Sequence, residues 1–118
     1  MKNEATGFDR IVKALNFSVN GIKSCYQSET AFKQEVWAAI VLVPTALWLT
    51  TSSIERVLLI TPIFIVLITE VVNTAIESVV DRIGSEHNEL SGKAKDLGSA
   101  AVLFSLLFVI VTWSIILI

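Results

Sequence analysis

Three long stretches without a charged residue limit what this chain can fold into. They lie between Glu35 and Glu55, between Arg56 and Glu70, and from Leu97 to Ile118. A helix needs about 20 predominantly apolar residues to cross a membrane. The chain has 118 residues, of which 53% are hydrophobic and only 17% are charged, a balance far from that of a soluble domain. The sequence therefore predicts one all-α membrane domain over residues 1–118.

Polar segments divide this domain into a surface helix and three transmembrane helices. The segment from Phe8 to Tyr26 has apolar residues on one helical face and polar residues on the other, a pattern typical of an amphipathic helix lying in the membrane surface. Ser53 and Ser91 are the expected N-caps of the second and third spans. Gly84 is expected to end the second span. The predicted elements are the surface helix at about 8–26 and spans at about 31–49, 54–83 and 91–118, after a loose start at residues 1–7.

The distribution of basic residues predicts the orientation of the chain. Arg56 alone flanks the turn between the first two spans. The remaining basic residues lie before the first span or between the second and third. Because basic residues collect on the cytoplasmic side, the N-terminus is expected in the cytoplasm and the C-terminus outside. These basic residues are Lys2, Arg10, Lys13, Lys23 and Lys33 before the first span, and Arg82, Lys93 and Lys95 before the third.

A stripe of polar residues runs along the second half of the second span. At about 100° per residue, Glu70, Asn73, Thr74, Glu77 and Asp81 fall within an arc of roughly 100°. A carboxylate facing lipid costs on the order of 2–4 kcal/mol, so such residues usually face a bundle interior or a cavity and mark a functional site. The stripe is therefore the candidate site of the chain.

These residue types suit phosphoryl transfer. Glu77 could join Glu29 in holding a hard cation such as Mg²⁺ through oxygen ligands. Glu70 lies deeper, where a poorly hydrated carboxylate is a competent general base. The structural alternative is that the carboxylates pair with Arg10, Lys93 or Lys95 and only lock helices together.

Several functions are disfavoured by composition and motifs. The net charge of −2 argues against a nucleic-acid partner. A single cysteine, Cys25, excludes an intramolecular disulfide and a cysteine-rich zinc site, and it is expected to be a small buried side chain. Neither a P-loop nor the protein-kinase motif set occurs.

The residues around the stripe resemble the prokaryotic diacylglycerol kinases, which are small three-span membrane enzymes. The similarity lies in the runs 70–77, 80–86 and 89–102. It extends at matching spacing to Gly7-Phe8 with Arg10, to 29–35 and to 56–60.

The resemblance implies a homotrimer in the bacterial inner membrane, with active sites at subunit contacts near the cytoplasmic interface. The expected reaction is Mg²⁺-dependent transfer of the γ-phosphoryl group of ATP to diacylglycerol, which yields phosphatidic acid. It implies Glu70 as the base, Asn73 as a positioning group, and Glu29 and Glu77 as metal ligands. Nucleotide contacts are implied for Arg10, Phe17, Glu29, Glu77, Glu86, His87, Asn88, Lys95 and Asp96, and lipid contacts for Arg56, Glu70 and Ser99.

Two other functions remain open at this stage. Related three-span kinases phosphorylate undecaprenol. The residues of the second span that carry the resemblance serve the phosphoryl-transfer step, so they do not distinguish the two alcohols. A non-enzymatic ion or proton path, or a membrane assembly subunit, would also use intramembrane carboxylates. Such a protein would not need Arg10, Lys93, Lys95 and Asp96 near the same interface.

Overall fold

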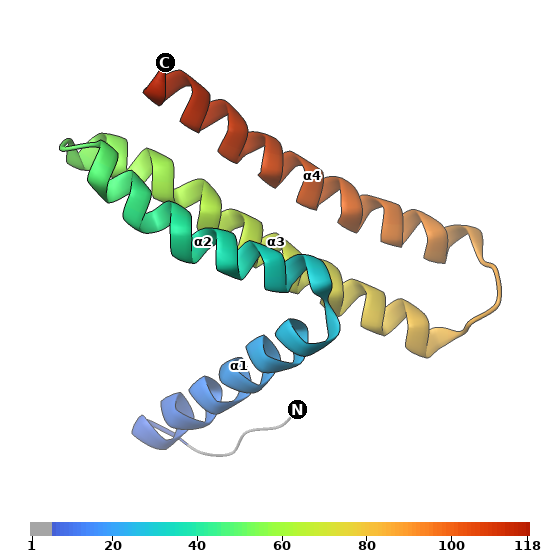
Figure 1. The fold of residues 1–118 in the computed structure, drawn as a ribbon. Helices are drawn as coiled ribbons and strands as arrows, with labels where there is room; N and C mark the ends of the chain where they lie inside the picture. Colours follow the sequence, from blue (N-terminus) through green and yellow to red (C-terminus); the bar gives the residue numbers. More distant parts are fainter. Residues whose placement is uncertain (1–5) are drawn as a thin grey trace.

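Four helices make up the part of the chain that the structure, a computed structural model, describes, namely residues 6–118. They are α1 (Phe8–Ser28), α2 (Thr30–Leu49), α3 (Ser53–Ile83) and α4 (Glu89–Leu117) (Figure 1). The predicted all-α class is confirmed, and α2, α3 and α4 are each long and apolar enough to cross a membrane. Of the segment expected to be loose, residues 1–5, including Lys2, lie outside the described residues.

The helix ends correct two of the predicted caps. Ser52, rather than Ser53, is the N-cap of α3, and its Oγ accepts a hydrogen bond from Glu55 N at 3.4 Å. Asn88 caps α4, so the assignment of Ser91 as its cap was wrong. Asparagine caps a helix as well as serine does, and a helix that begins at Glu89 has an acidic residue in its first turn, where the helix dipole favours it. Gly84 follows the last residue of α3, as predicted.

The central helix of the molecule is α3, which packs against both α2 and α4. α3 runs antiparallel to both α2 and α4, so the α2–α3 turn and the C-terminus lie at one end (Figure 1). The α3–α4 loop and the junction with α1 lie toward the other end. Between α3 and α4, Trp113 Nε1 donates a hydrogen bond to Leu59 O at 3.0 Å. Farther along, Thr69 Oγ1 donates one to Ser105 Oγ at 3.1 Å.

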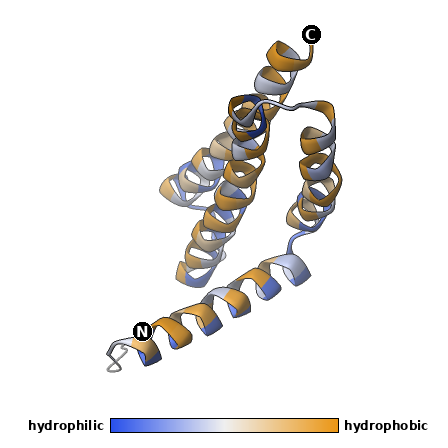
Figure 2. Cartoon of the chain, turned by 90° about the vertical axis from the view of Figure 1, so that its left-hand side faces the viewer, coloured by the Kyte–Doolittle hydropathy of each residue, from blue (hydrophilic) through white to orange (hydrophobic). Residues whose placement is uncertain are grey.

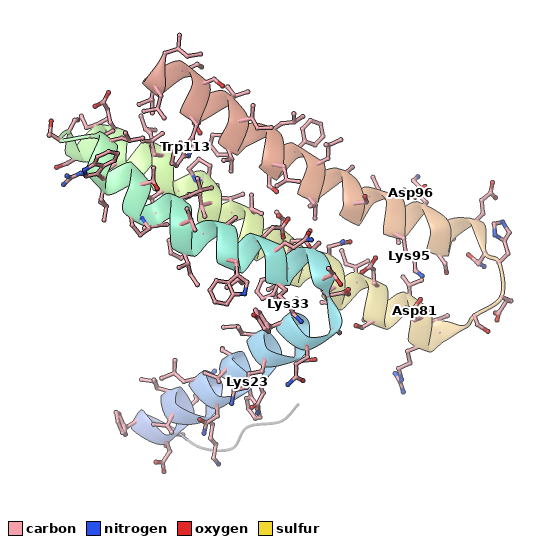
Figure 3. The ribbon with its side chains drawn as sticks, in the orientation of Figure 1. Lys23, Lys33, Asp81, Lys95, Asp96 and Trp113 are labelled. Atoms are coloured by element: carbon pink, nitrogen blue, oxygen red, sulfur yellow. The ribbon has the colours of Figure 1, made fainter. Side chains whose placement is uncertain are left out.

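The angle between α1 and α2 is held by contacts around Tyr26. Trp37 Nε1 donates a hydrogen bond to the Tyr26 hydroxyl at 2.9 Å. The Lys33 ammonium lies 5.2 Å from the centre of the Tyr26 ring, within the range of a cation–π interaction. The backbone of Glu29 between the two helices is extended, and α1 leaves the bundle at a steep angle, with Lys33 near the bend (Figure 3).

Most of the large apolar side chains are exposed in the isolated chain. Figure 2 shows that α1 alternates between hydrophobic and hydrophilic residues, whereas the long helices are predominantly hydrophobic. Phe64 of α3 is 56% exposed and Phe104 of α4 is 72% exposed. Apolar surface of this extent needs lipid or other protein around it, which agrees with an integral membrane protein.

Candidate active site

The predicted polar stripe lies on α3, and its deepest acid is buried. Glu70 is only 6% exposed. Glu29 is the N-cap residue of α2, and Glu77 follows Glu70 by two turns on the same face of α3. Two of the three carboxylates that the sequence singled out thus share one face of α3, and the third begins α2.

Asn73 lies between Glu70 and Glu77 on α3 and is half-buried. Its Oδ1 atom is buried and has no hydrogen-bond partner within residues 6–118. A buried polar atom without a partner is uncommon in native structures and calls for an explanation.

A hydrogen bond connects the end of α1 to this region. Cys25 Sγ donates to Thr74 Oγ1 at 3.5 Å, and Cys25 is 3% exposed, as expected for a small buried residue. Burial raises the pKa of the Cys25 thiol. The hydrogen bond to Thr74 acts in the opposite direction, and the charges of Glu29 and Glu70 again raise it. This contact places the α1–α2 junction, and with it Glu29, beside the acidic stripe.

Asp81, the last acid of the stripe, has a structural partner. Lys95 Nζ on α4 lies 2.7 Å from Asp81 Oδ1, and it is the only ion pair within residues 6–118. The alternative in which the acids lock helices together therefore holds for Asp81, whereas Glu29, Glu70 and Glu77 take no part in the pair. Asp96, the next residue after Lys95, lies on the other side of α4 and is exposed (Figure 3).

The residues expected to contact the nucleotide form separate groups in this single chain. Arg10 and Phe17 are exposed on α1, whereas Lys95 and Asp96 are on α4. Within the described residues α1 makes no contact with α4. Glu86 and His87 are exposed in the loop before α4. Asn88 ends this loop, and its Oδ1 accepts hydrogen bonds from the amides of Leu90 and Ser91 at 2.9 and 3.2 Å.

The two residues expected to contact lipid besides Glu70 lie in different places. Ser99 is exposed on α4, next to Gly98, which faces Asn73. Arg56 lies in the first turns of α3, so it is about 21 Å from Glu70 along the helix axis. Its guanidinium donates hydrogen bonds to the backbone oxygens of Leu47 and Thr50, both from Nη2 at 2.9 Å, which satisfies carbonyls at the end of α2.

Glu35 was not among the candidate site residues predicted from the sequence, and the structure buries part of its carboxylate. Its Oε1 atom is buried and has no hydrogen-bond partner within residues 6–118. It lines an otherwise apolar cavity of about 290 Å³ between α2, α3 and α4. The signal in the sequence was the helical spacing of Glu35 with the small apolar residues Ala38 and Ala39 on the same face.

The carboxylates of this site suit one kind of metal ion. Among residues 6–118 no group of three or more His, Cys, Asp or Glu side chains is placed to hold a metal by itself. Two carboxylates are sufficient for Mg²⁺, which keeps several waters and takes its remaining ligands from substrate phosphates. Glu29 and Glu77 supply the hard oxygen atoms that such a site requires, so the residues present fit this ion.

Comparison with known proteins identifies one family. The sequence profile of the family described as "Prokaryotic diacylglycerol kinase" matches residues 16–117. The chain is 50% identical over 117 residues to the diacylglycerol kinase of Escherichia coli (strain K12), which covers 99% of this chain and 96% of the relative. It is 43% identical over 112 residues to that of Pseudomonas aeruginosa, covering 95% of this chain and 91% of the relative. With that of Haemophilus influenzae it shares 41% identity over 110 residues, which is 93% of each chain.

Proposed function

The chain belongs to the prokaryotic diacylglycerol kinase family and is therefore an enzyme, and we propose that it transfers the γ-phosphoryl group of ATP to the free hydroxyl of 1,2-diacylglycerol. The products are phosphatidic acid and ADP. The observation that carries this proposal is the buried carboxylate of Glu70, on the same face of α3 as Glu77. Phosphoryl transfer depends mostly on positioning and charge neutralisation, and this group of acids is suited to both.

In this proposal the oxygen of the lipid hydroxyl attacks the γ-phosphorus while Glu70 accepts the hydroxyl proton. The bond between the γ-phosphorus and the oxygen that bridges it to the β-phosphate breaks, and ADP leaves. Asn73 positions the reacting groups. Glu29 and Glu77 would hold Mg²⁺, which when bound neutralises phosphate charge. Burial of Glu70 supports its role, because a base shielded from water can accept a proton from a lipid alcohol that enters sideways from the bilayer.

The nucleotide is proposed to lie beyond these acids, at the cytoplasmic interface of the inner membrane. Its contacts are assigned to Arg10 and Phe17 on α1, to Glu86, His87 and Asn88 before α4, and to Lys95 and Asp96 on α4. Lys95 must exchange Asp81 for a phosphate when ATP binds. Ser99 contacts the lipid near the reacting hydroxyl. Arg56 contacts a distal part of the lipid, since it is about 21 Å from Glu70.

We further propose that the active enzyme is a homotrimer whose sites are shared between subunits. One subunit keeps its α1 and α4 nucleotide residues apart, and a neighbour could complete the set. The face of α3 away from the acids also exposes apolar residues, including Val72 and Val79. In this assembly α1 lies in the membrane surface with its exposed Phe8, Leu15 and Ile22 toward lipid, the N-terminus is cytoplasmic and the C-terminus periplasmic.

A transfer assay tests the reaction and its acceptor. The purified full chain in mixed micelles receives γ-³²P-labelled ATP and Mg²⁺ with either diacylglycerol or undecaprenol. We expect labelled phosphatidic acid, formed faster than labelled undecaprenyl phosphate. A faster reaction with undecaprenol would reassign the acceptor. Transfer to neither alcohol would exclude a lipid kinase and favour a membrane ion path or an assembly subunit.

A further inference from the structure

Gly98 of α4 lies directly against Asn73 of α3, in a position that has no room for a side chain. Gly98 is buried. A Cβ atom at this position would overlap Asn73 Oδ1 and lie 3.1 Å from Asn73 Cγ. The two other glycines within helices, Gly21 and Gly92, would have nothing within 4 Å of an added Cβ. The space at Gly98 is therefore occupied by the amide of Asn73.

Hydrogen bonding within the described chain does not explain the position of this amide, because its buried oxygen has no partner there. Leaving such an atom unpaired is unfavourable, so the packing against α4 must hold it in place. The two branches of a planar amide diverge, and because the oxygen is the atom nearest Gly98, the nitrogen is directed elsewhere. Asn73 follows Glu70 by three residues and precedes Glu77 by four, so all three lie on one face of α3.

We propose that Gly98 is a positioning residue for phosphoryl transfer. By lacking a side chain, it lets the Asn73 oxygen lie against α4 and so directs the amide nitrogen over the face that carries Glu70 and Glu77. This inference rests on the proposed function, in which Asn73 positions the reacting groups. A methyl group at position 98 rotates the Asn73 side chain without moving the backbone, so it disturbs catalysis more than folding.

The test compares Gly98→Ala with the matched variant Gly92→Ala, which is on the same helix in open space. Both are made in the natural chain and in an Asn73→Ser background, and kcat and KM for diacylglycerol are measured at saturating ATP and Mg²⁺. Because displacement by about 1 Å costs up to 100-fold in rate, Gly98→Ala should lower kcat on the order of 10–100-fold. KM for diacylglycerol should stay within about twofold, since the lipid is not contacted by Gly98.

The Asn73→Ser background separates this inference from the proposed function. A serine at position 73 has no amide to displace, so Gly98→Ala should cause no further loss of kcat in that background. An equal loss in both backgrounds, or a loss no larger than that of Gly92→Ala, would overturn the role of Gly98. Full activity in Asn73→Ser alone would instead refute the role of Asn73 and leave the lipid-kinase reaction standing.

Thermal unfolding in detergent tests the contact between Gly98 and Asn73 directly, even if the Asn73→Ser background is inactive. Only the natural chain has an asparagine that must rotate away from the new methyl group. The shift in unfolding temperature caused by Gly98→Ala should therefore be more positive with serine at position 73 than with asparagine. Equal shifts in the two backgrounds would show that Gly98 does not act through Asn73.

Discussion

Lys95 Nζ on α4 lies 2.7 Å from Asp81 Oδ1 on α3, which joins the two helices next to the loop that connects them (Figure 3). The Lys95 and Asp81 side chains are 43% and 67% exposed, so the pair is screened by solvent and adds little to stability. The ion pair matters for function because it occupies the Lys95 ammonium group, which is proposed to bind a phosphate of ATP.

Asp81→Asn should strengthen ATP binding. The substitution removes the anion that competes with phosphate for Lys95, so KM for ATP should fall about two- to fivefold at low salt, the range of exposed charge pairs. The effect should shrink as salt is added, because exposed charges are then screened. Steady-state kinetics over a salt series measure it, with Glu89→Gln as the control at an exposed acid of α4. A rise in KM would mean that Asp81 orients Lys95 for the nucleotide.

Glu70→Gln should abolish most of the activity while leaving the fold intact. Glutamine keeps the size of the side chain but cannot accept the lipid proton, and general bases contribute roughly 10²–10⁴-fold to rate. The transfer assay measures the loss. Glu55→Gln is the matched control, because it is on the same helix about 22 Å away and should retain activity. If Glu70→Gln kept full activity, the base would have to be another group.

Glu29→Gln and Glu77→Gln should weaken the response to magnesium. Each removes one of the two carboxylates proposed for the ion, so the Mg²⁺ concentration for half-maximal activity should rise by at least about tenfold. Titration with Mg²⁺ at fixed ATP measures this shift, and Glu55→Gln should leave the titration unchanged. An unaltered titration for either variant would remove that residue from the proposed site.

Arg56→Met should lower thermal stability. The side chain loses its hydrogen bonds to Leu47 O and Thr50 O, and the carbonyls at the end of α2 lose a positive partner, at a cost of about 1–2 kcal/mol. Unfolding in detergent followed by circular dichroism reveals the change. Arg82→Met makes the same substitution at the exposed far end of α3 and should have little effect. Equal unfolding temperatures for the two variants would contradict this role.

The Cys25 thiol should react slowly with maleimide at neutral pH, and faster as the pH rises. Burial raises its pKa, so the reactive thiolate appears only above the range of an exposed cysteine. Labelling of the folded protein across a pH series from neutral to alkaline, before and after unfolding in SDS, gives the profile. Ser28→Cys in a Cys25→Ser background supplies an exposed thiol of the same helix. Equal labelling rates at neutral pH would show that Cys25 is accessible.

Much of the fold follows from properties that are local in sequence. Hydropathy identifies three helices able to cross a membrane because span length depends on a continuous apolar run. The helical period alone aligns Glu70, Asn73 and Glu77 on one face, and Gly84 ends α3 because its flexible backbone does not favour a helix. The predicted capping residues Ser53 and Ser91 differ from the observed Ser52 and Asn88, since serine and asparagine are nearly equivalent at an N-cap.

Contacts between helices could not be predicted in the same way. The sequence left Arg10, Lys93 and Lys95 as equal partners for the acids, and only the packing of α3 against α4 selected Lys95 for Asp81. It also set the Asn73 amide against Gly98 and put the Glu35 carboxylate beside an apolar cavity. The amino-acid sequence by itself determined which residues share a helix face, because that depends on a fixed rotation per residue. Which faces meet was decided by the tertiary structure, because it depends on how side chains of distant segments fit together.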